Sequence, residues 1–228
     1  MAAAALAASL GAHAAHGDTV ESPSAEVEPR DFAWQPEPGD TIHFDVYRQG
    51  SDFGTHIVRF EENAAGQLEA VIDVDLRAGL GPITLFRYRL DARETWQDGY
   101  IHAVEGEVND DGARKSVTAR RDGARLEVDG TAFEGELPAS IIPASHWNIW
   151  QTETDRILST ESGEVIEVDV QPLGRETVMA GGEPVEARKF LMDSDIDVTL
   201  WYDDQDRWVK LAFEARGQEI DYVLRESY

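Results

Sequence analysis

Apolar and polar residues alternate with a period of two along most of this chain. In the segment that begins at Asp40, Ile42, Phe44 and Val46 alternate with polar or aromatic neighbours. The same pattern recurs at 68–76, 86–92, 166–170, 185–191, 198–202, 209–213 and 220–224. A period of two places successive side chains on opposite faces of a strand, so each segment is expected to form a strand with one buried face. Parallel strands are more continuously apolar, and the pattern therefore predicts an antiparallel sheet.

Turn residues separate these segments at short intervals. Asp98-Gly99, Asp122-Gly123, Asp129-Gly130 and Gly181-Gly182 supply the positive φ angles that tight hairpins require. No change of composition marks a domain boundary after residue 40. We therefore predict an all-β fold over residues 40–228: a single antiparallel meander of about a dozen strands, curled into a barrel or a strongly bent sheet.

One segment, residues 138–150, does not alternate. Pro143 is suited to the first turn of a helix, and Ser145 is a suitable N-cap. Trp147 and Trp150 are three residues apart and would share one face of such a helix. We predict one short helix near residues 143–152 that closes one end of the sheet or crosses its concave face.

The N-terminal residues have the features of an export signal. Residues 2–15 form a small, apolar run that is too short to span a bilayer, and Ala12-His13-Ala14 provides the A-x-A pattern of a signal peptidase site. No Lys or Arg precedes this run. Residues 1–17 are therefore predicted to be a signal peptide, residues 18–39 a proline-containing disordered leader, and the protein to be exported to the periplasm.

Composition excludes several classes of function. Asp and Glu number 45 against 20 Lys and Arg, and the net charge of −25 disfavours nucleic acid and anionic lipid surfaces as partners. The chain has no cysteine, which excludes disulfides, thiol catalysis and Cys-zinc sites. The histidines of the folded part have no metal-ligand spacing, and no phosphate-binding glycine loop is present. We expect no metal and no cofactor, and the sequence does not indicate an oligomeric state.

The sequence also lacks a membrane-spanning segment. A lipid-facing barrel needs a continuous apolar band on one face of every strand. The segment from Arg114 to Arg121 carries apolar residues only at Val117 and Ala119. We therefore expect no membrane span.

Several short strings between Asp40 and Leu224 are shared with a known family. They include Phe86-Arg87-Tyr88-Arg89, Pro143-Ala144-Ser145-His146-Trp147-Asn148, Leu158-Ser159-Thr160-Glu161-Ser162-Gly163, Leu200-Trp201-Tyr202-Asp203 and Arg207-Trp208-Val209-Lys210-Leu211. Together they resemble an exported family of Gram-negative bacteria, the domain of unknown function 6134. His146, usually tyrosine, and Glu161, usually glutamine, depart from the family pattern.

The resemblance implies export and a β-rich fold, but it implies no catalytic residue. A looser similarity links such families to periplasmic curved-sheet proteins that hold lipids or lipoproteins, which is an analogy of fold alone.

Charged residues near residue 90 are the first candidates for a site. Arg87, Arg89 and Arg93 share one face and would bind an anionic headgroup if that face lined a pocket. The alternative, which we favour, is a solvated face paired with neighbouring Asp and Glu. Glu94 lies on the other face of this predicted strand, together with Phe86 and Tyr88. Its carboxyl is therefore expected to be buried with a raised pKa. A structural role for Glu94 is favoured over that of a catalytic acid.

Aromatic residues give the second set of candidates. Trp201 and Trp208 lie opposite the apolar phase of their strands, so they are predicted to face away from the main core and to line a second apolar surface. The alternative is that both sheet faces are partly covered. Trp147 is expected to anchor the helical segment, and His146 beside it is a candidate contact or acid/base residue.

Three functions remain open from the sequence. The first is a periplasmic binding or carrier module that holds an apolar or lipid-like ligand, with Trp147, Trp201, Trp208, Arg87, Glu94 and His146 as candidate ligand-binding residues. The second is an envelope enzyme that uses Glu94 or His146 as acid or base, although catalysis is not favoured. The third is an assembly protein that binds a partner through a sheet edge. We favour the first function.

Overall fold

The computed structural model describes residues 34–80 and 83–225. The predicted signal peptide, residues 1–17, and the predicted leader as far as residue 33 lie outside the described residues. Within the part that is described, Trp34 packs edge-on against Phe60 and Trp147, with ring centroids 5.2 and 6.5 Å apart. The packed part of the chain therefore begins before Asp40.

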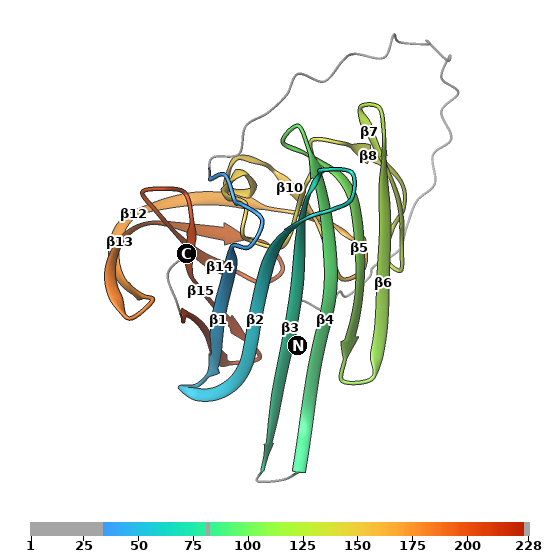
Figure 1. Ribbon diagram of the computed structural model, residues 1–228. Coiled ribbons are helices and arrows are strands. Elements are labelled where there is room, and N and C mark those ends of the chain that lie inside the picture. The colour runs from blue at the N-terminus through green and yellow to red at the C-terminus, as the bar shows by residue number, and fades with distance from the viewer. Residues whose placement is uncertain (1–33, 81–82, 226–228) are drawn as a thin grey trace.

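Thirteen strands of the described chain form one antiparallel sheet (Figure 1). In chain order they are β1 (Thr41–Arg48), β2 (Ser51–Glu62), β3 (Leu68–Leu80), β4 (Ile83–Gln97), β5 (Tyr100–Asp110), β6 (Ala113–Asp122), β7 (Arg125–Gly130), β8 (Glu134–Pro138), β12 (Asp169–Ala180), β13 (Glu183–Asp193), β14 (Val198–Asp203), β15 (Trp208–Ala215) and β16 (Gln218–Leu224). The spatial order is β12-β13-β14-β15-β16-β1-β2-β3-β4-β5-β6-β7-β8. The first strand thus pairs with the last in the middle of the sheet, where Phe44 lies opposite Leu224.

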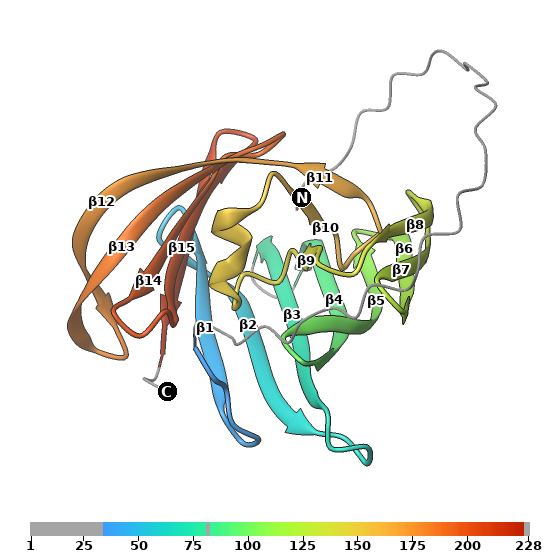
Figure 2. The same cartoon turned by 90° about the horizontal axis from the view of Figure 1, so that it is seen from above.

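The sheet is strongly bent but open. Among the described residues no strand pairing joins β8 to β12, which are its two edges. Both edges curve toward the same side and enclose a concave face (Figure 2). The predicted all-β antiparallel meander is confirmed, as a bent sheet and not a closed barrel.

Residues 139–168, here called the crossing segment, run from β8 to β12 across the concave face (Figure 2). The segment contains β9 (Ile142–Pro143), the 3-10 helix η1 (Ile149–Glu153), β10 (Arg156–Leu158) and β11 (Val165–Glu167). The strands β11-β10-β9 form a small second sheet, in which β9 and β10 are parallel. A segment that covers the concave face agrees with the prediction from its non-alternating sequence.

The helix itself differs from the prediction. It is a 3-10 helix that begins at Ile149, and its N-cap is Asn148, whose side chain accepts a hydrogen bond from the Trp150 backbone. Pro143 instead lies in β9. The predicted earlier start at Ser145 is wrong because His146 has φ 66°, a left-handed conformation that interrupts any right-handed helix at that residue.

No helix in the described ranges is long and apolar enough to cross a membrane.

Two glycines allow the crossing segment to approach the sheet closely. A Cβ atom at Gly106 in β5 would lie 1.9 Å from the backbone oxygen of Thr160, and a Cβ at Gly130 would lie 2.4 Å from that of Ser162. Contacts this short to backbone atoms cannot be relieved by a side-chain rotation. Glycine at these positions therefore fixes where residues 160–162 meet the concave face.

We expect Gly106→Ala to destabilise the protein by about 2–3 kcal/mol or more, because the added methyl group displaces the backbone of the crossing segment. Chemical unfolding followed by circular dichroism measures this loss. Glu107→Ala is the matched control, since Glu107 is the next residue of β5 and is exposed; a change within about 0.5 kcal/mol is expected there. An unchanged unfolding midpoint for Gly106→Ala would contradict the close approach.

Candidate functional site

The space under the crossing segment is filled differently at its two ends. At the end where β2 is joined to β3 and β4 to β5, it holds an aromatic cluster of Trp34, Phe60, Trp96 and Trp147. Trp147 is 1% exposed, and its indole lies 5.1 Å from the ring of Phe60 and 5.3 Å from that of Trp96. This end is packed core.

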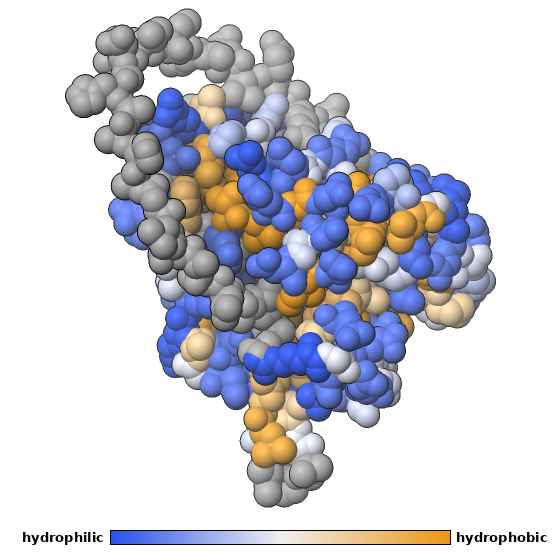
Figure 3. Space-filling model, turned by 180° about the vertical axis from the view of Figure 1, so that it is seen from behind, coloured by the Kyte–Doolittle hydropathy of each residue, from blue (hydrophilic) through white to orange (hydrophobic). Residues whose placement is uncertain are grey.

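The opposite end contains a partly open cavity of about 650 Å³. Antiparallel order brings the turns that follow β1, β3, β5 and β15 to this end. The cavity is lined there by Arg48, the last residue of β1, and by Asp111 and Arg216 from the turns after β5 and β15. Leu85 also lines it and is 62% exposed on the projecting β3–β4 hairpin, whose surface is apolar at the bottom of Figure 3. The cavity volume is within the usual range of small-molecule sites.

Apolar side chains from the strands form most of the cavity wall. They come from β3, β4, β14, β15 and β16 and include Val74, Leu76, Leu90, Val198, Leu211, Phe213 and Ile220. Residues of the crossing segment from Ala144 to Glu167 cover the opposite side. An apolar wall of this kind suits a hydrocarbon group.

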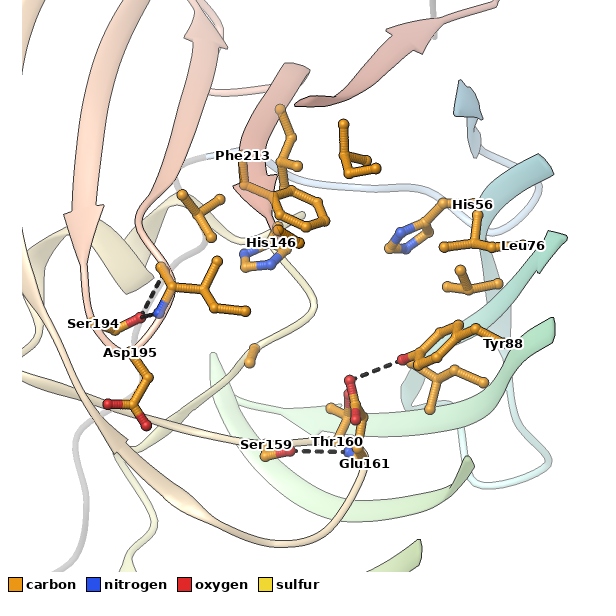
Figure 4. A pocket seen from close by; sticks show the side chains of 18 of the residues that line it. His56, Leu76, Tyr88, His146, Ser159, Thr160, Glu161, Ser194, Asp195 and Phe213 are labelled. Carbon is orange, nitrogen blue, oxygen red and sulfur yellow. Dashed lines mark hydrogen bonds between the residues drawn. The ribbon is translucent and has the colours of Figure 1, made fainter. Parts of the chain in front are cut away.

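Four polar side chains point into this space from different sides, namely His56, Tyr88, His146 and Glu161 (Figure 4). Tyr88 in β4 donates a hydrogen bond to Oε1 of Glu161 in the crossing segment at 2.8 Å. Burial raises the pKa of Tyr88 well above its ordinary value, so the phenol remains a donor. Burial also raises the pKa of Glu161, while the Tyr88 hydrogen bond acts in the opposite direction.

His146 is held in one orientation by a closed set of hydrogen bonds. Its Nδ1 lies 2.9 Å from Oε1 of buried Gln151, Gln151 donates to the hydroxyl of Tyr202 at 2.5 Å, and that hydroxyl donates to the backbone oxygen of His146 at 2.8 Å. Because Oε1 only accepts, Nδ1 carries the proton and Nε2 is an acceptor. Burial lowers the pKa of His146, although the Gln151 hydrogen bond opposes this.

His56 is the second imidazole at the cavity. Burial, with the neighbouring His146 as the second cause, lowers the pKa of His56 to about 3. Both histidine rings pack against Trp208, with centroids 5.3 and 5.7 Å from the indole. The Nε2 atom of His56 is buried and has no hydrogen-bond partner among the described residues. At neutral pH both imidazoles are therefore uncharged.

No metal site is formed by these groups. In the residues that the structure describes, no three or more His, Asp or Glu side chains are grouped so that they could hold a metal ion.

The predicted site residues are separated by the fold. His146 lines the cavity, and Trp208 lies directly behind it as a buried neighbour of both histidines. Trp208 faces inward, against the prediction, because a bulge in β15 pairs Tyr202 with Trp208 and Trp201 with Lys210, which leaves Val209 as an extra residue. The bulge reverses the phase that the alternation implied.

Trp201 faces the convex side, as predicted, but it is only 4% exposed and does not line the cavity. Its indole lies between the ammonium groups of Lys189 and Lys210, 5.0 and 4.8 Å from the ring, and donates to Glu176. Arg87 is also on the convex side and forms an ion pair with Asp75 at 3.5 Å. Neither residue lines the cavity. The favoured alternative for the arginine face, pairing with neighbouring carboxylates, is what the structure shows.

Glu94 and Trp147 belong to the aromatic cluster and do not line the cavity. Oε2 of Glu94 accepts hydrogen bonds from the indoles of Trp96 and Trp147 at 3.1 and 3.0 Å. Burial raises the pKa of Glu94, while the hydrogen bonds from Trp147 and Trp96 act against this. The carboxyl group is thus an internal anchor for the crossing segment.

Sequence reasoning missed His56, Tyr88 and Glu161 as cavity residues. A signal was present for two of them, because His56 and Tyr88 occupy the buried phase of strands whose other inward residues include Val58 and Leu90. A polar side chain in that phase needs a partner or a ligand. Glu161 had no comparable signal, since it lies in an irregular loop.

Fold and cavity together define a β-protein with an open, barrel-like sheet and an internal space under a crossing segment. The chain belongs to the family described as Domain of unknown function (DUF6134), which matches residues 44–225. No curated protein matches the chain.

One similar solved structure is the beta-barrel-like protein of the domain of unknown function DUF1849 from Brucella abortus. It has a TM-score of 0.56 and 10% sequence identity, over 82% of this chain and 95% of that chain. At this identity the likeness concerns the fold alone.

Proposed function

We propose that this protein is an exported binding or carrier module of the periplasm that holds an apolar or lipid-like ligand in the cavity under the crossing segment. The observation that carries the proposal is the cavity of about 650 Å³, which has apolar walls and buried polar groups directed into it. A hydrocarbon group would lie against the strand residues, and a polar end would meet His56, His146 or Glu161.

The two alternatives have less support. For an acid/base enzyme, Glu94 is withdrawn from the cavity and engaged with two indoles, which leaves only His146 of the two predicted residues. For an assembly protein that binds through a sheet edge, the long edge strand β12 is interrupted by a bulge between Pro172 and Gly174. A proline and a bulge in an edge strand hinder the addition of a further strand.

Occupation of the cavity can be tested with Nile red, a neutral dye whose fluorescence rises in apolar surroundings. We expect saturable binding at a single site. Ala144→Trp should weaken binding at least about tenfold, because Ala144 lines the cavity and its backbone is fixed by a hydrogen bond to Leu158 at 2.9 Å. The added indole therefore fills the cavity instead of moving out of it.

Ala65→Trp is the control, since Ala65 is an exposed turn residue outside the cavity. It should bind the dye as the unsubstituted protein does, and circular dichroism should show that both variants are folded. If the unsubstituted protein binds no dye, or if folded Ala144→Trp binds it equally well, the cavity is not a binding site.

A further inference from the structure

The lining of the cavity is unusually acidic for a site that would hold a lipid-like molecule. Two guanidinium groups line it, those of Arg48 and Arg216, whereas five carboxylates do so: Asp111, Glu161, Glu164, Glu167 and Asp195. Within the described ranges no Lys, Arg or His nitrogen lies within 4 Å of any of the five. The net charge of −25 adds to this negative potential. A carboxylate or phosphate end group would be repelled.

Glu161 is the carboxylate best placed to contact a ligand. Its backbone N–H donates to Oγ of Ser159 at 3.2 Å, and its Oε1 accepts from Tyr88, so the side chain has a fixed position in the loop. Its Oε2 has no hydrogen-bond partner among the described residues. A half-buried carboxylate with a free oxygen and no cationic nitrogen within 4 Å is suited to pair with an ammonium group, because charge-assisted hydrogen bonds are the strong ones.

A second observation points to a ligand independently of the acidic groups. His56 is 6% exposed, its Nε2 has no partner among the described residues, and its ring points into the cavity (Figure 4). His146, whose ring packs against the same indole of Trp208, presents a further Nε2 acceptor from the crossing segment. A buried ring nitrogen without a partner, such as Nε2 of His56, is costly, and the cost is removed when a ligand forms a hydrogen bond with it.

We propose that the cavity selects a long-chain amine, whose ammonium group pairs with Glu161 and whose hydrocarbon chain lies against the apolar wall that includes Leu76 and Leu211. This inference rests on the proposed binding function and adds the chemical class of the ligand. His56 Nε2 forms a hydrogen bond with the same ligand, either with an N–H or with a neighbouring hydroxyl. The polar end is thus a donor and a cation, not an anion.

The test uses three probes that share one hydrocarbon chain: dodecylamine, dodecanol and dodecanoate. Each is titrated at pH 7, below its micellar concentration, in competition with bound Nile red. We expect dodecylamine to displace the dye at a concentration at least about tenfold lower than dodecanol, and dodecanoate to be the weakest competitor. This order depends only on the unsubstituted protein.

Glu161→Gln then assigns the preference to one residue. The amide keeps an oxygen that accepts from Tyr88, so the loop is retained while the negative charge is removed. We expect the preference for amine over alcohol to fall to within about threefold, with dodecanol binding unchanged. Glu107→Gln, an exposed position on β5, is the matched control and should keep the full preference.

The outcomes separate this inference from the function on which it rests. If none of the three probes displaces the dye, and the dye itself does not bind, the binding function fails. If all three compete equally, or if dodecanoate is the best, the cavity holds apolar chains without selecting an amine, and only this inference is overturned. The same holds if folded Glu161→Gln keeps the preference for the amine.

Discussion

Replacing Trp147 with alanine is expected to cost about 3–5 kcal/mol of folding free energy, which is the typical loss for truncation of a buried aromatic residue. The indole is 1% exposed and contacts Phe60 and Trp96, and it donates one of the two indole hydrogen bonds to the buried carboxyl of Glu94. For a domain of this size the loss corresponds to a fall in melting temperature of about 10 °C. Differential scanning calorimetry measures it.

Two further variants serve as comparisons for Trp147→Ala. Trp150→Ala changes the same residue type in the same segment, but Trp150 is only half-buried and should cost less. Trp147→Phe keeps most of the packing and removes only the hydrogen bond to Glu94, so an intermediate loss is expected. Because Trp147 does not line the cavity, folded Trp147→Ala should still bind Nile red. Equal melting temperatures for Trp147→Ala and the unsubstituted protein would mean that the aromatic cluster does not anchor the crossing segment.

Acidification is expected to destabilise the protein through His56. The pKa of this imidazole is about 3 in the folded protein, against 6.5 in an unfolded chain. Between these two values the unfolded chain binds more protons, so the free energy of unfolding falls as the pH is lowered below about 6.5 and is fully recovered above it. The slope approaches about 1.4 kcal/mol per pH unit, so His56 alone accounts for a loss of about 2 kcal/mol at pH 5.

The contribution of His56 has to be measured as a difference between two proteins, because carboxyl groups inside the protein also change its stability with pH. The raised pKa values of Glu94 and Glu161 have the opposite effect, because their protonated forms favour the folded protein as the pH falls. His56→Phe removes only the imidazole and keeps an aromatic ring beside Trp208 and Tyr222. Urea unfolding measures the free energy of unfolding of both proteins at pH 7 and pH 5. Between these pH values, that of the unsubstituted protein should fall by about 2 kcal/mol more than that of the variant. A difference that does not change with pH would show that His56 is not held neutral by burial.

The fold was accessible from the sequence because strand alternation and turn residues are local signals. The phase of alternation correctly placed Phe44 and Leu200 inside, and it placed Trp201 on the other face of the sheet, where lysine side chains cover the indole. It failed for Trp208, because a bulge inserts one residue into β15 and nothing in the local sequence marks it. The start of the helix was misplaced for another reason: Pro143 and Ser145 carry local helix signals, whereas His146 has a left-handed conformation and is held by hydrogen bonds to Gln151 and Tyr202.

The site was less accessible than the fold because its residues meet only through tertiary structure. Tyr88 and Glu161 are separated by 73 residues, and their contact depends on the path of the crossing segment over the concave face. Glycine at position 106 allows that path, but the need for it appears only when Thr160 is seen against β5. Glu94 shows the converse: the sequence predicted its burial correctly, but its neighbours proved to be two indoles and not the cavity.

The pairing of the first strand with the last has a consequence for the order of folding. While the chain is being synthesised, β1 can pair with β2 as soon as both have formed, but its other edge stays open until β16 has been made. The pair Phe44 and Leu224 joins nearly the two ends of the folded chain, and contacts so distant in sequence make folding slow. Strand edges that stay open are exposed to aggregation. We therefore expect the sheet to be completed only after synthesis ends, so a protein missing β16 would keep two open edges in the middle of its sheet.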